Sequence, residues 1–343
     1  MVPVLDRNLN PLMPCKERRA RTMMEKGRAK PYWKDGIFCI ILQEEPSARN
    51  YQDIVIGVDP GTKREGFTVM TEHRVVMNIT SNAITHVKDK MESRKNLRGN
   101  RRKRKTPYRE CRNNRHSRKL LGRLPPSIKS RWDAKLRIIG RLKNMIPITD
   151  VSVEDVSAKT IKNAKKWNTM FSPVESGKHY FYKEILKLGM SLFKWDGYDT
   201  YVWRTTNTEY KKTCNKLSES WTAHNVDSHC LCEMMFGFSI RPIKLIKRLI
   251  FFCPMRRNLF KQNIIKGGIL RRDGGSIAVG IKKYTLVRHP KYGLVYTGGT
   301  TKNRISLYDI HTNLRLCQNA KKCDLKVHSY NLKWYIKHIR GDD

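Results

Sequence analysis

Three acidic residues stand at positions from which carboxylates can hold metal ions. Asp59 ends an apolar run, and Glu154 ends a second stretch rich in β-forming residues. Asp227 lies three residues after His224, so their side chains share one face if this segment is helical. An ionised carboxylate at the end of an apolar strand must be solvated, paired or bound to metal. Each acid alone is typical of a cap or turn, but the order strand, strand, helix favours one metal site.

The chemistry that such a set predicts is phosphodiester hydrolysis with two metal ions. Three carboxylates nearly balance the charge of two Mg²⁺ ions, which together hold the attacking water and the leaving oxygen. We therefore expect Asp59, Glu154 and Asp227 to be the metal ligands, with Mn²⁺ able to substitute for Mg²⁺. We expect His224 to position or deprotonate the attacking water. The alternative for His224 is a structural histidine packed at the start of a helix.

Two residues beside this set are expected to lie outside the site. Asp155 follows Glu154 directly and should point to the opposite face of the strand, because successive strand side chains alternate. His229 comes two residues after Asp227 and should point away from it on a helix.

The charge of the chain indicates a polyanionic partner, of which nucleic acid is the commonest. It has 70 Lys and Arg against 30 Asp and Glu, a formal net charge of +40. The excess is uneven: residues 1–90 and 151–240 carry +4 and +2, whereas residues 91–150 and 241–343 carry +16 and +18. This alternation favours a catalytic core interleaved with nucleic-acid-binding modules over a uniformly basic protein of the ribosomal type.

The most basic segment is internal, with fourteen lysines and arginines against one acid, Glu110, between residues 94 and 123. Arginines recur there at helical spacing, so one helix face can present guanidinium groups to a phosphate backbone. A solvated basic tail or a localisation signal is the alternative, but an amphipathic helix carrying Trp132, Leu136, Ile139 and Leu142 follows the run. We expect RNA contacts from Arg94, Arg98, Arg101, Arg102, Arg104, Arg112, Arg115 and Arg118.

The elements that must position these residues can be outlined from apolar patterning and turn residues. A small β-α-β-like module with strands at 2–5 and 37–42 and a helix at 15–27 ends near residues 45–47. Strands at 54–61 and 66–70 form a hairpin, another strand covers 150–156, and a helix runs through 230–235. Short strands at 274–279, 284–287, 294–296 and 304–308 predict a β-barrel-like C-terminal domain.

Several classes of protein are disfavoured by the sequence. No stretch reaches the roughly 18 apolar residues of a membrane span, and the N-terminus lacks a basic region followed by an apolar one, so secretion is not expected. The nine cysteines form no C-x-x-C pair, which indicates reduced thiols and an intracellular protein, in bacterial cytoplasm or an organelle.

The acidic motifs resemble those of a known group of nucleases. Val58-Asp59-Pro60-Gly61-Thr62 with Gly66, then Glu154, then His224-Asn225-Val226-Asp227 are similar to the three motifs of the RuvC branch of the RNase H-like superfamily. Pro11-Leu12-Met13-Pro14, preceded by Val4-Leu5-Asp6-Arg7, resembles the PLMP module of the IscB/IsrB group of transposon-encoded, RNA-guided nucleases. Residues 26–30, 93–102 and 171–178 fit the same group, and the resemblance runs essentially end to end.

One departure from the group concerns the 73 positions between Glu154 and Asp227. IscB-type relatives carry an HNH nuclease there, whose metal site needs a general-base histidine and further ligands. Residues 155–223 contain a single histidine, His179, so no HNH domain fits. The chain therefore resembles the HNH-less IsrB subgroup, for which the implied activity is nicking of the displaced, non-target DNA strand.

The resemblance implies an α/β fold: an RNase H-like (RuvC) mixed sheet with helices, split by an arginine-rich bridge helix, plus a PLMP module and a C-terminal β-rich domain. The implied segments are 1–50 (PLMP), 51–90 (RuvC part I), 91–146 (bridge and following helix), 147–240 (RuvC parts II and III) and 241–343 (RNA-interacting segment and β-rich domain). The β-rich domain would read a short motif beside the target, with DNA contacts from Lys282, Lys283, Arg288 and Lys302 and RNA contacts from Arg256 and Arg257.

The implied partners are a structured guide (omega) RNA and double-stranded target DNA opened into an R-loop, bound by one protein chain per RNA, with no membrane. Sequence specificity would lie in guide pairing. Two alternatives stay open: an RNA-binding ribonucleoprotein module whose RuvC core is only a scaffold, and an unguided junction resolvase. For the C-terminal domain, a basic face that binds only RNA is the alternative.

Overall fold

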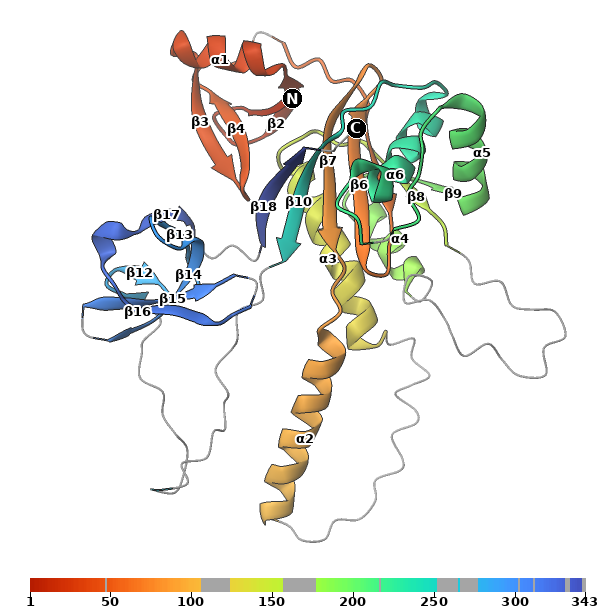
Figure 1. Ribbon diagram of the computed structural model, residues 1–343. Helices are drawn as coiled ribbons and strands as arrows, with labels where there is room; N and C mark the ends of the chain where they lie inside the picture. The colour runs from red at the N-terminus through yellow and green to blue at the C-terminus, as the bar shows by residue number, and fades with distance from the viewer. Residues whose placement is uncertain are drawn as a thin grey trace, which may run out of the picture. The chain divides into compact units, whose positions relative to one another are not determined.

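The computed structural model describes residues 1–46, 48–105, 124–156, 177–215, 217–251, 265, 277–301, 303–310, 312–330 and 334–340. The chain divides into two compact units (Figure 1). Unit 1 comprises Met1–Leu249 with Lys337–Asp343, and unit 2 comprises Ile250–Ile336. Mixed sheets flanked by helices confirm the expected α/β class.

A seven-stranded mixed sheet forms the centre of unit 1, in the order β18-β10-β7-β6-β5-β8-β9. β6 is antiparallel to β5 and β7, whereas β8 is parallel to β5, β9 to β8, and β10 to β7. The predicted hairpin and the predicted strand before Glu154 are confirmed as β5, β6 and β8. The strands are β5 (Ile54–Asp59), β6 (Arg64–Thr71), β7 (Arg74–Asn82), β8 (Asp150–Glu154), β9 (Ser191–Trp195), β10 (Leu245–Phe251) and β18 (Trp334–Arg340).

Two of these strands come from residues 241–343, for which an RNA-interacting segment and a β-rich domain were expected. β10 pairs with β7 through Ile246–Leu249, and β18 lies beside β10 at the edge of the sheet. The expected division at residue 241 thus falls before β10, and the compact unit begins instead at Ile250. The reason is that β10 continues the buried sheet: Ile246 and Leu249 are buried.

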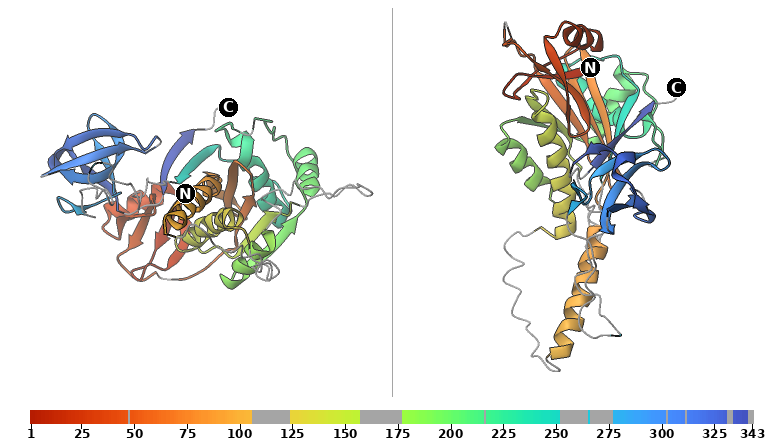
Figure 2. Two further views of the ribbon diagram at one scale, coloured as in Figure 1. Left: turned by 90° about the horizontal axis from the view of Figure 1, so that it is seen from below. Right: turned by 90° about the vertical axis from the view of Figure 1, so that its left-hand side faces the viewer.

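Helices cover both faces of this sheet, and the side view in Figure 2 shows the strands between α3 and α6. Alternation of side chains along β6 explains this, since Glu65 faces α3 while Gly66 faces α6. The helices of this unit outside the N-terminal module are α2 (Val87–Lys105), α3 (Pro126–Lys143), α4 (Lys178–Lys187), α5 (Gly197–Asn207) and α6 (Trp221–Phe236).

α3 is held to the sheet by a buried ion pair inside an apolar stripe. Trp132, Ile139 and Leu142 are buried as the amphipathic pattern predicts. Leu136 is half-buried, and Lys135 takes the inner position in its place. The Lys135 Nζ lies 2.5 Å from Glu65 Oε1 and 4.7 Å from the centre of the Trp132 ring. Removing one partner would leave the other charge buried and uncompensated, so this pair fixes where α3 packs.

α6 approaches the sheet more closely than side chains normally allow. A Cβ atom on Gly57 would lie 1.9 Å from the Ser228 carbonyl oxygen, and one on Gly66 would lie 2.1 Å from that of His224. Real Cβ atoms do not come that close, so the two glycines create the gap in which the helix lies. Every residue of α6 from Ala223 to Glu233 is buried.

Asn225 fixes the rotation and height of α6 on the sheet. Its Nδ2 donates to the carbonyl oxygens of Phe67 and Ile79, at 3.2 and 3.1 Å, and its Oδ1 accepts from Thr80 Oγ1 at 2.6 Å. All these groups are buried, so each lost partner would leave an unsatisfied polar group costing about 1–3 kcal/mol. The helix that carries Asp227 is therefore pinned to β6 and β7.

The N-terminal module is a second, four-stranded sheet in the order β2-β1-β4-β3, with β1 parallel to β4. The predicted strands at 2–5 and 37–42 and the helix are confirmed, and Gly27 after the helix has the left-handed φ of +69°. The two strands between them were not anticipated. The elements are β1 (Val2–Leu5), β2 (Pro11–Cys15), α1 (Glu17–Glu25), β3 (Ala29–Lys34) and β4 (Ile37–Leu42).

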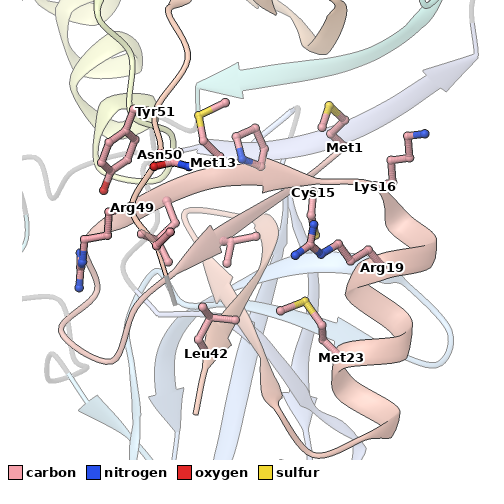
Figure 3. Close-up of a pocket in the computed structure, with 14 residues that line it drawn as sticks. Met1, Met13, Cys15, Lys16, Arg19, Met23, Leu42, Arg49, Asn50 and Tyr51 are labelled. Carbon is pink, nitrogen blue, oxygen red and sulfur yellow. The ribbon is translucent and has the colours of Figure 1, made fainter. Parts of the chain in front are cut away.

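A cavity of about 520 Å³ opens in this module between β2, α1 and the chain around Tyr51 (Figure 3). Its lining is largely apolar, including Met13, Met23 and Leu42, with the basic residues Lys16 and Arg19 beside them. None of the three acids that the sequence singles out lines it.

Unit 2 is built on a five-stranded antiparallel sheet in the order β16-β15-β14-β13-β17, with a two-stranded hairpin beside it in the chain. The predicted strands near 284–287, 294–296 and 304–308 correspond to β13, β14 and β15. Val287, Val295 and Leu307 lie at the centre of its core. The elements are β11 (Ile277–Ala278), β12 (Ile281–Lys282), β13 (Leu286–His289), β14 (Gly293–Thr301), β15 (Arg304–Asp309), β16 (Arg315–Ala320), the 3₁₀ turn Lys322–Asp324 and β17 (Lys326–Ser329).

No helix in the described ranges is long and apolar enough to cross a membrane.

The glycine gap under α6 leads to a testable expectation for stability. Gly57→Ala should lower the free energy of unfolding by on the order of 3 kcal/mol, because the added methyl group meets a helix carbonyl that cannot move alone. Gly140→Ala, within α3 and with open space around the new Cβ, should instead raise it by about 0.5–1 kcal/mol. Urea unfolding of both variants checks this; equal stabilities would contradict the close packing of α6.

Candidate metal centre

Asp59 and Glu154 lie side by side because they end neighbouring parallel strands. Val58 pairs with Val153, so the next residue of each strand lies at the same edge of the sheet. Asp59 shares a strand face with Gly57, against which α6 packs. Both carboxylates therefore point toward the face that α6 covers.

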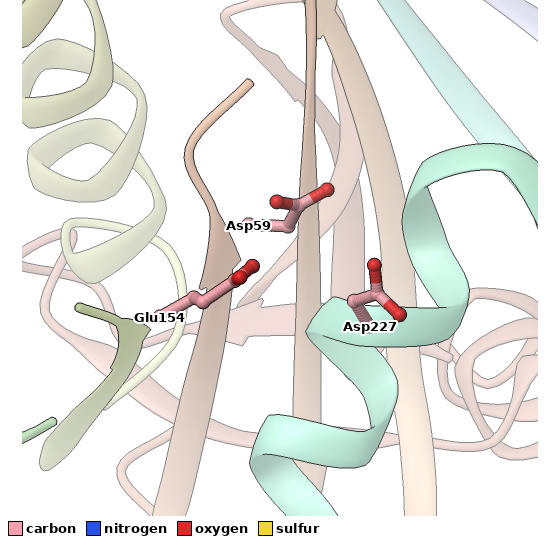
Figure 4. Close-up of side chains that lie close together, drawn as sticks. All are labelled: Asp59, Glu154 and Asp227. Atoms are coloured by element: carbon pink, nitrogen blue, oxygen red, sulfur yellow. The ribbon is translucent and has the colours of Figure 1, made fainter. Parts of the chain in front are cut away.

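Asp227 completes the cluster from the opposite direction. It lies on α6 one turn beyond His224, and Figure 4 shows its side chain across from those of Asp59 and Glu154. Carboxylate oxygens of the three acids lie within 4.8 Å of one another. The structure thus brings together the three residues that the sequence singles out as ligands.

Crowding of carboxylates makes two of these acids hard to ionise without a cation. Burial first, and then the carboxylates of Asp227 and Glu154, raise the pKa of Asp59 well above its ordinary value. Burial and the carboxylate of Asp227 likewise raise the pKa of Glu154. Three carboxyl groups this close cannot all stay ionised in a half-buried site. A bound cation would stabilise their ionised forms.

Two basic side chains meet part of that demand at Asp227. Arg204 Nη1 on α5 donates to Asp227 Oδ1 at 2.7 Å, and Lys212 Nζ donates to Asp227 Oδ2. Burial opposes the charge on Lys212, but the adjacent Asp227 carboxylate outweighs it and raises the pKa of the lysine. Both oxygens of Asp227 are thus occupied by cationic donors, whereas Asp59 and Glu154 share a side-chain hydrogen bond with each other.

His224 lies at the rim of the cluster. Its side chain is 10% exposed, and its Nδ1 is 3.9 Å from Asp59 Oδ2. It is therefore placed beside the acids, as the three-residue spacing to Asp227 predicts, rather than packed away from them.

The two neighbours expected to lie outside the site have other partners. Asp155 pairs with Lys178 at 2.7 Å and accepts a hydrogen bond from the Tyr182 hydroxyl at 2.8 Å. His229 is fully buried, and its Nε2 lies 2.9 Å from the Ile240 carbonyl oxygen. Neither side chain reaches the acidic cluster, which confirms both expectations.

The chemistry of the donor set fits a hard divalent cation. All three side chains offer carboxylate oxygens, the ligands that Mg²⁺ and Mn²⁺ prefer. Their separation allows one ion to touch more than one acid, and the raised pKa values of Asp59 and Glu154 show that positive charge is in deficit there.

Three of the expected RNA contacts are described and exposed: Arg94, Arg98 and Arg102 lie on α2. The backbone of Arg101 and Arg104 belongs to the same helix. The other expected RNA contacts lie outside the described residues: Arg112, Arg115, Arg118, Arg256 and Arg257.

The expected DNA contacts belong to unit 2. Lys282 ends β12 and Arg288 lies on β13, both exposed. The Nζ of Lys283 lies 5.8 Å from the centre of the Tyr284 ring. Lys302 lies outside the described residues.

Sequence reasoning missed the basic and small residues around the acids. Arg204 and Lys212 gave no signal, because a single basic residue in a nearly neutral segment is ordinary. Gly197, which begins α5, was also missed: a Cβ there would lie 2.7 Å from Glu154 Oε1. Only a resemblance-based motif drew attention to Gly66, and nothing indicated that it leaves room for a helix.

Comparison with known proteins gives one family match. Residues 2–169 match the model of a family described as RRXRR protein. The match includes the N-terminal module, Asp59, α2 and Glu154, and ends before α6. No curated protein matches the chain.

The bond between Lys212 and Asp227 leads to a prediction for the affinity of the site for Mg²⁺. Lys212→Met should tighten binding of Mg²⁺ by roughly tenfold or more, because the lysine occupies an oxygen that the ion would otherwise use. Lys211→Met removes the same charge from the adjacent exposed residue and should leave the affinity nearly unchanged. Titration calorimetry with Mg²⁺ and with Mn²⁺ measures both; equal affinities would show that Lys212 does not compete with the ion.

Proposed function

We propose that this protein is an RNA-guided DNA endonuclease that acts as a Mg²⁺-dependent nickase. It binds a structured guide (omega) RNA, pairs that RNA with target DNA beside a short adjacent motif, and cuts the displaced, non-target strand. The observation that carries the proposal is the cluster of Asp59, Glu154 and Asp227, with carboxylate oxygens within 4.8 Å and His224 at its rim.

The strand arrangement supports a nuclease core of the RuvC, RNase H-like kind. In the order β7-β6-β5-β8-β9, three antiparallel strands are followed by two parallel ones, and acids end the adjacent strands β5 and β8. A third acid comes from the helix across that face. This is the arrangement that the resemblance of the three acidic motifs leads us to expect.

In this proposal each residue of the site has a separate role in hydrolysis. Bound Mg²⁺ ions would activate the attacking water and neutralise charge on the leaving oxygen. Asp59, Glu154 and Asp227 would hold these ions through their carboxylate oxygens. His224 is close enough to Asp59 to orient the water or accept its proton. Arg204 holds one oxygen of Asp227, which fixes the direction in which that carboxylate points.

The segment between Glu154 and Asp227 supports cutting of one strand only. α4, β9 and α5 occupy about half of its described part, and all three belong to unit 1. The 20 residues 157–176 lie outside the described part of the chain. So short a segment leaves no room for an added HNH domain, so the guide-paired strand would stay intact.

The basic segments support nucleic acid as the partner. α2 presents exposed arginines at helical spacing, and unit 2 carries exposed basic residues on a β-sheet domain. We propose that α2 binds the guide RNA and that unit 2 contacts DNA beside the target, with one protein chain per RNA. Sequencing the RNA that copurifies with the protein would identify the guide.

Substitution of the central acid tests the nuclease proposal. Asp59→Asn, in protein purified with its RNA, should lower the rate of Mg²⁺-dependent nicking by on the order of a thousandfold or more, because one of the three carboxylates that would hold the metal is lost. The measurement is conversion of supercoiled plasmid carrying the matched target to the open circle. RNA and DNA binding should persist.

The control is Asp155→Asn, which alters the carboxylate next to Glu154 but outside the cluster and should retain nicking. A wild-type complex that gives no nicked product under these conditions would favour a non-cleaving scaffold. Cutting without any RNA would favour an unguided resolvase, and cleavage of both strands would contradict the nickase assignment.

The role of α2 has its own test. Arg94→Gln with Arg98→Gln should weaken binding of the copurifying RNA and reduce the slope of log affinity against log salt concentration by about two, because two phosphate contacts are lost. Lys183→Gln with Lys187→Gln makes the same charge change on α4. Filter binding at several salt concentrations compares the pairs, and identical slopes would argue against α2 as an RNA-binding helix.

A further inference from the structure

Two tyrosines are exposed to solvent on α5, the helix whose Arg204 is bonded to Asp227. Tyr198 is 72% and Tyr201 is 53% exposed, and they lie one helical turn apart on the same face. Their ring centroids are 6.5 Å apart and the ring planes differ by 32°. Large aromatic side chains are usually mostly buried, so two neighbouring exposed rings on one helix face require a reason.

This face of α5 leads directly to the metal ligands. Arg204 comes one further turn along the helix, with its guanidinium 5.7 Å from the centre of the Tyr201 ring and its Nη1 bonded to Asp227. At the other end of α5, Gly197 lies against Glu154 Oε1. The row Tyr198, Tyr201, Arg204 therefore lies on a helix that touches two of the three acids.

The surroundings of the row favour nucleobases as its ligand. Two acids at the start of α5, Asp196 and Asp199, form a capping box with the helix backbone, so their charge disfavours a phosphate at that end. Past the end of α5, Lys211 is an exposed basic residue suited to phosphates. Flat rings beside basic side chains are the combination that binds single-stranded nucleic acid, because every base offers a face for stacking.

We propose that Tyr198 and Tyr201 form a stacking platform for unpaired bases of the DNA strand that enters the metal centre. The inference rests on the proposed nuclease function and names the side chains that would hold its displaced substrate strand. Bases in a duplex are already stacked and paired, so their faces are not available to side chains. The platform thus selects the unpaired strand and holds it where its backbone can reach the acids; both tyrosines are positioning residues.

The test compares Tyr198→Ala/Tyr201→Ala with Tyr198→Phe/Tyr201→Phe, which keeps the rings. Binding is measured without metal in the Asp59→Asn background, using a single-stranded DNA oligonucleotide that carries 2-aminopurine. The Ala pair should bind on the order of 10–100-fold more weakly and lose the change in fluorescence that stacking produces. The Phe pair should behave as the parent does, and Trp33→Ala, at an aromatic that is 63% exposed on β3, should have no effect.

Cleavage separates this inference from the proposed function. With otherwise wild-type complex and a target whose non-target strand is already unpaired, the Ala pair should raise KM by a similar factor with kcat little changed. Nicking with unchanged KM and unchanged oligonucleotide binding would overturn the platform and leave the nuclease assignment intact. If the wild-type complex does not cut but the Ala pair still loses stacking, the nuclease proposal fails while the single-strand site stands.

Discussion

The backbone of α6 lies against β5 and β6 with no side chain between them at Gly57 and Gly66. This contact decides where Asp227 stands, because the helix is rigid and Asn225 prevents it from sliding or turning on the sheet. The strands on which the other two acids stand are fixed by their pairing. A larger residue at either glycine would move Asp227 away from Asp59 and Glu154. Gly66 pairs directly with Asp59 across the sheet, so a packing constraint beside the cluster sets its geometry.

The cluster gathers more negative charge than its surroundings neutralise. Burial and repulsion from the Asp227 carboxylate raise the pKa of Asp59 and of Glu154, whereas Asp227 is held by Arg204 and Lys212. Asp227 is therefore neutralised and held in place by basic residues, whereas the negative charge of Asp59 and Glu154 is left for a cation to neutralise. α5 connects the two, since its first residue lies against Glu154 and its arginine holds Asp227. Its exposed tyrosines, Tyr198 and Tyr201, extend the same helix face into solvent, where we propose that unpaired bases stack.

Local patterns predicted the elements whose side chains alternate or repeat cleanly. The structure confirms the strands ending at Asp59 and Glu154, the strand beginning at Val2 and the amphipathic stripe around Trp132. These elements could be predicted because burial of one face requires apolar residues at regular spacing. The stripe was misread at one position: Lys135, not Leu136, points inward, because Glu65 on β6 supplies a buried partner. β10 and β18 were not expected in the large sheet, since a strand's partner depends on distant residues and not on its own composition.

The sequence by itself determined which residues could do chemistry. Carboxylates at strand ends, a histidine one helical turn before an acid, and arginines in an internal run are local facts about residue type and spacing, and the three acids do come together. Only the tertiary structure decided what surrounds them: that Arg204 and Lys212 hold Asp227, that glycines on two strands leave room for α6, and that Tyr198 and Tyr201 are exposed on the helix that carries Arg204. These contacts join residues far apart in the chain, and the free energy of each depends on burial and distance, which spacing along a sequence does not encode.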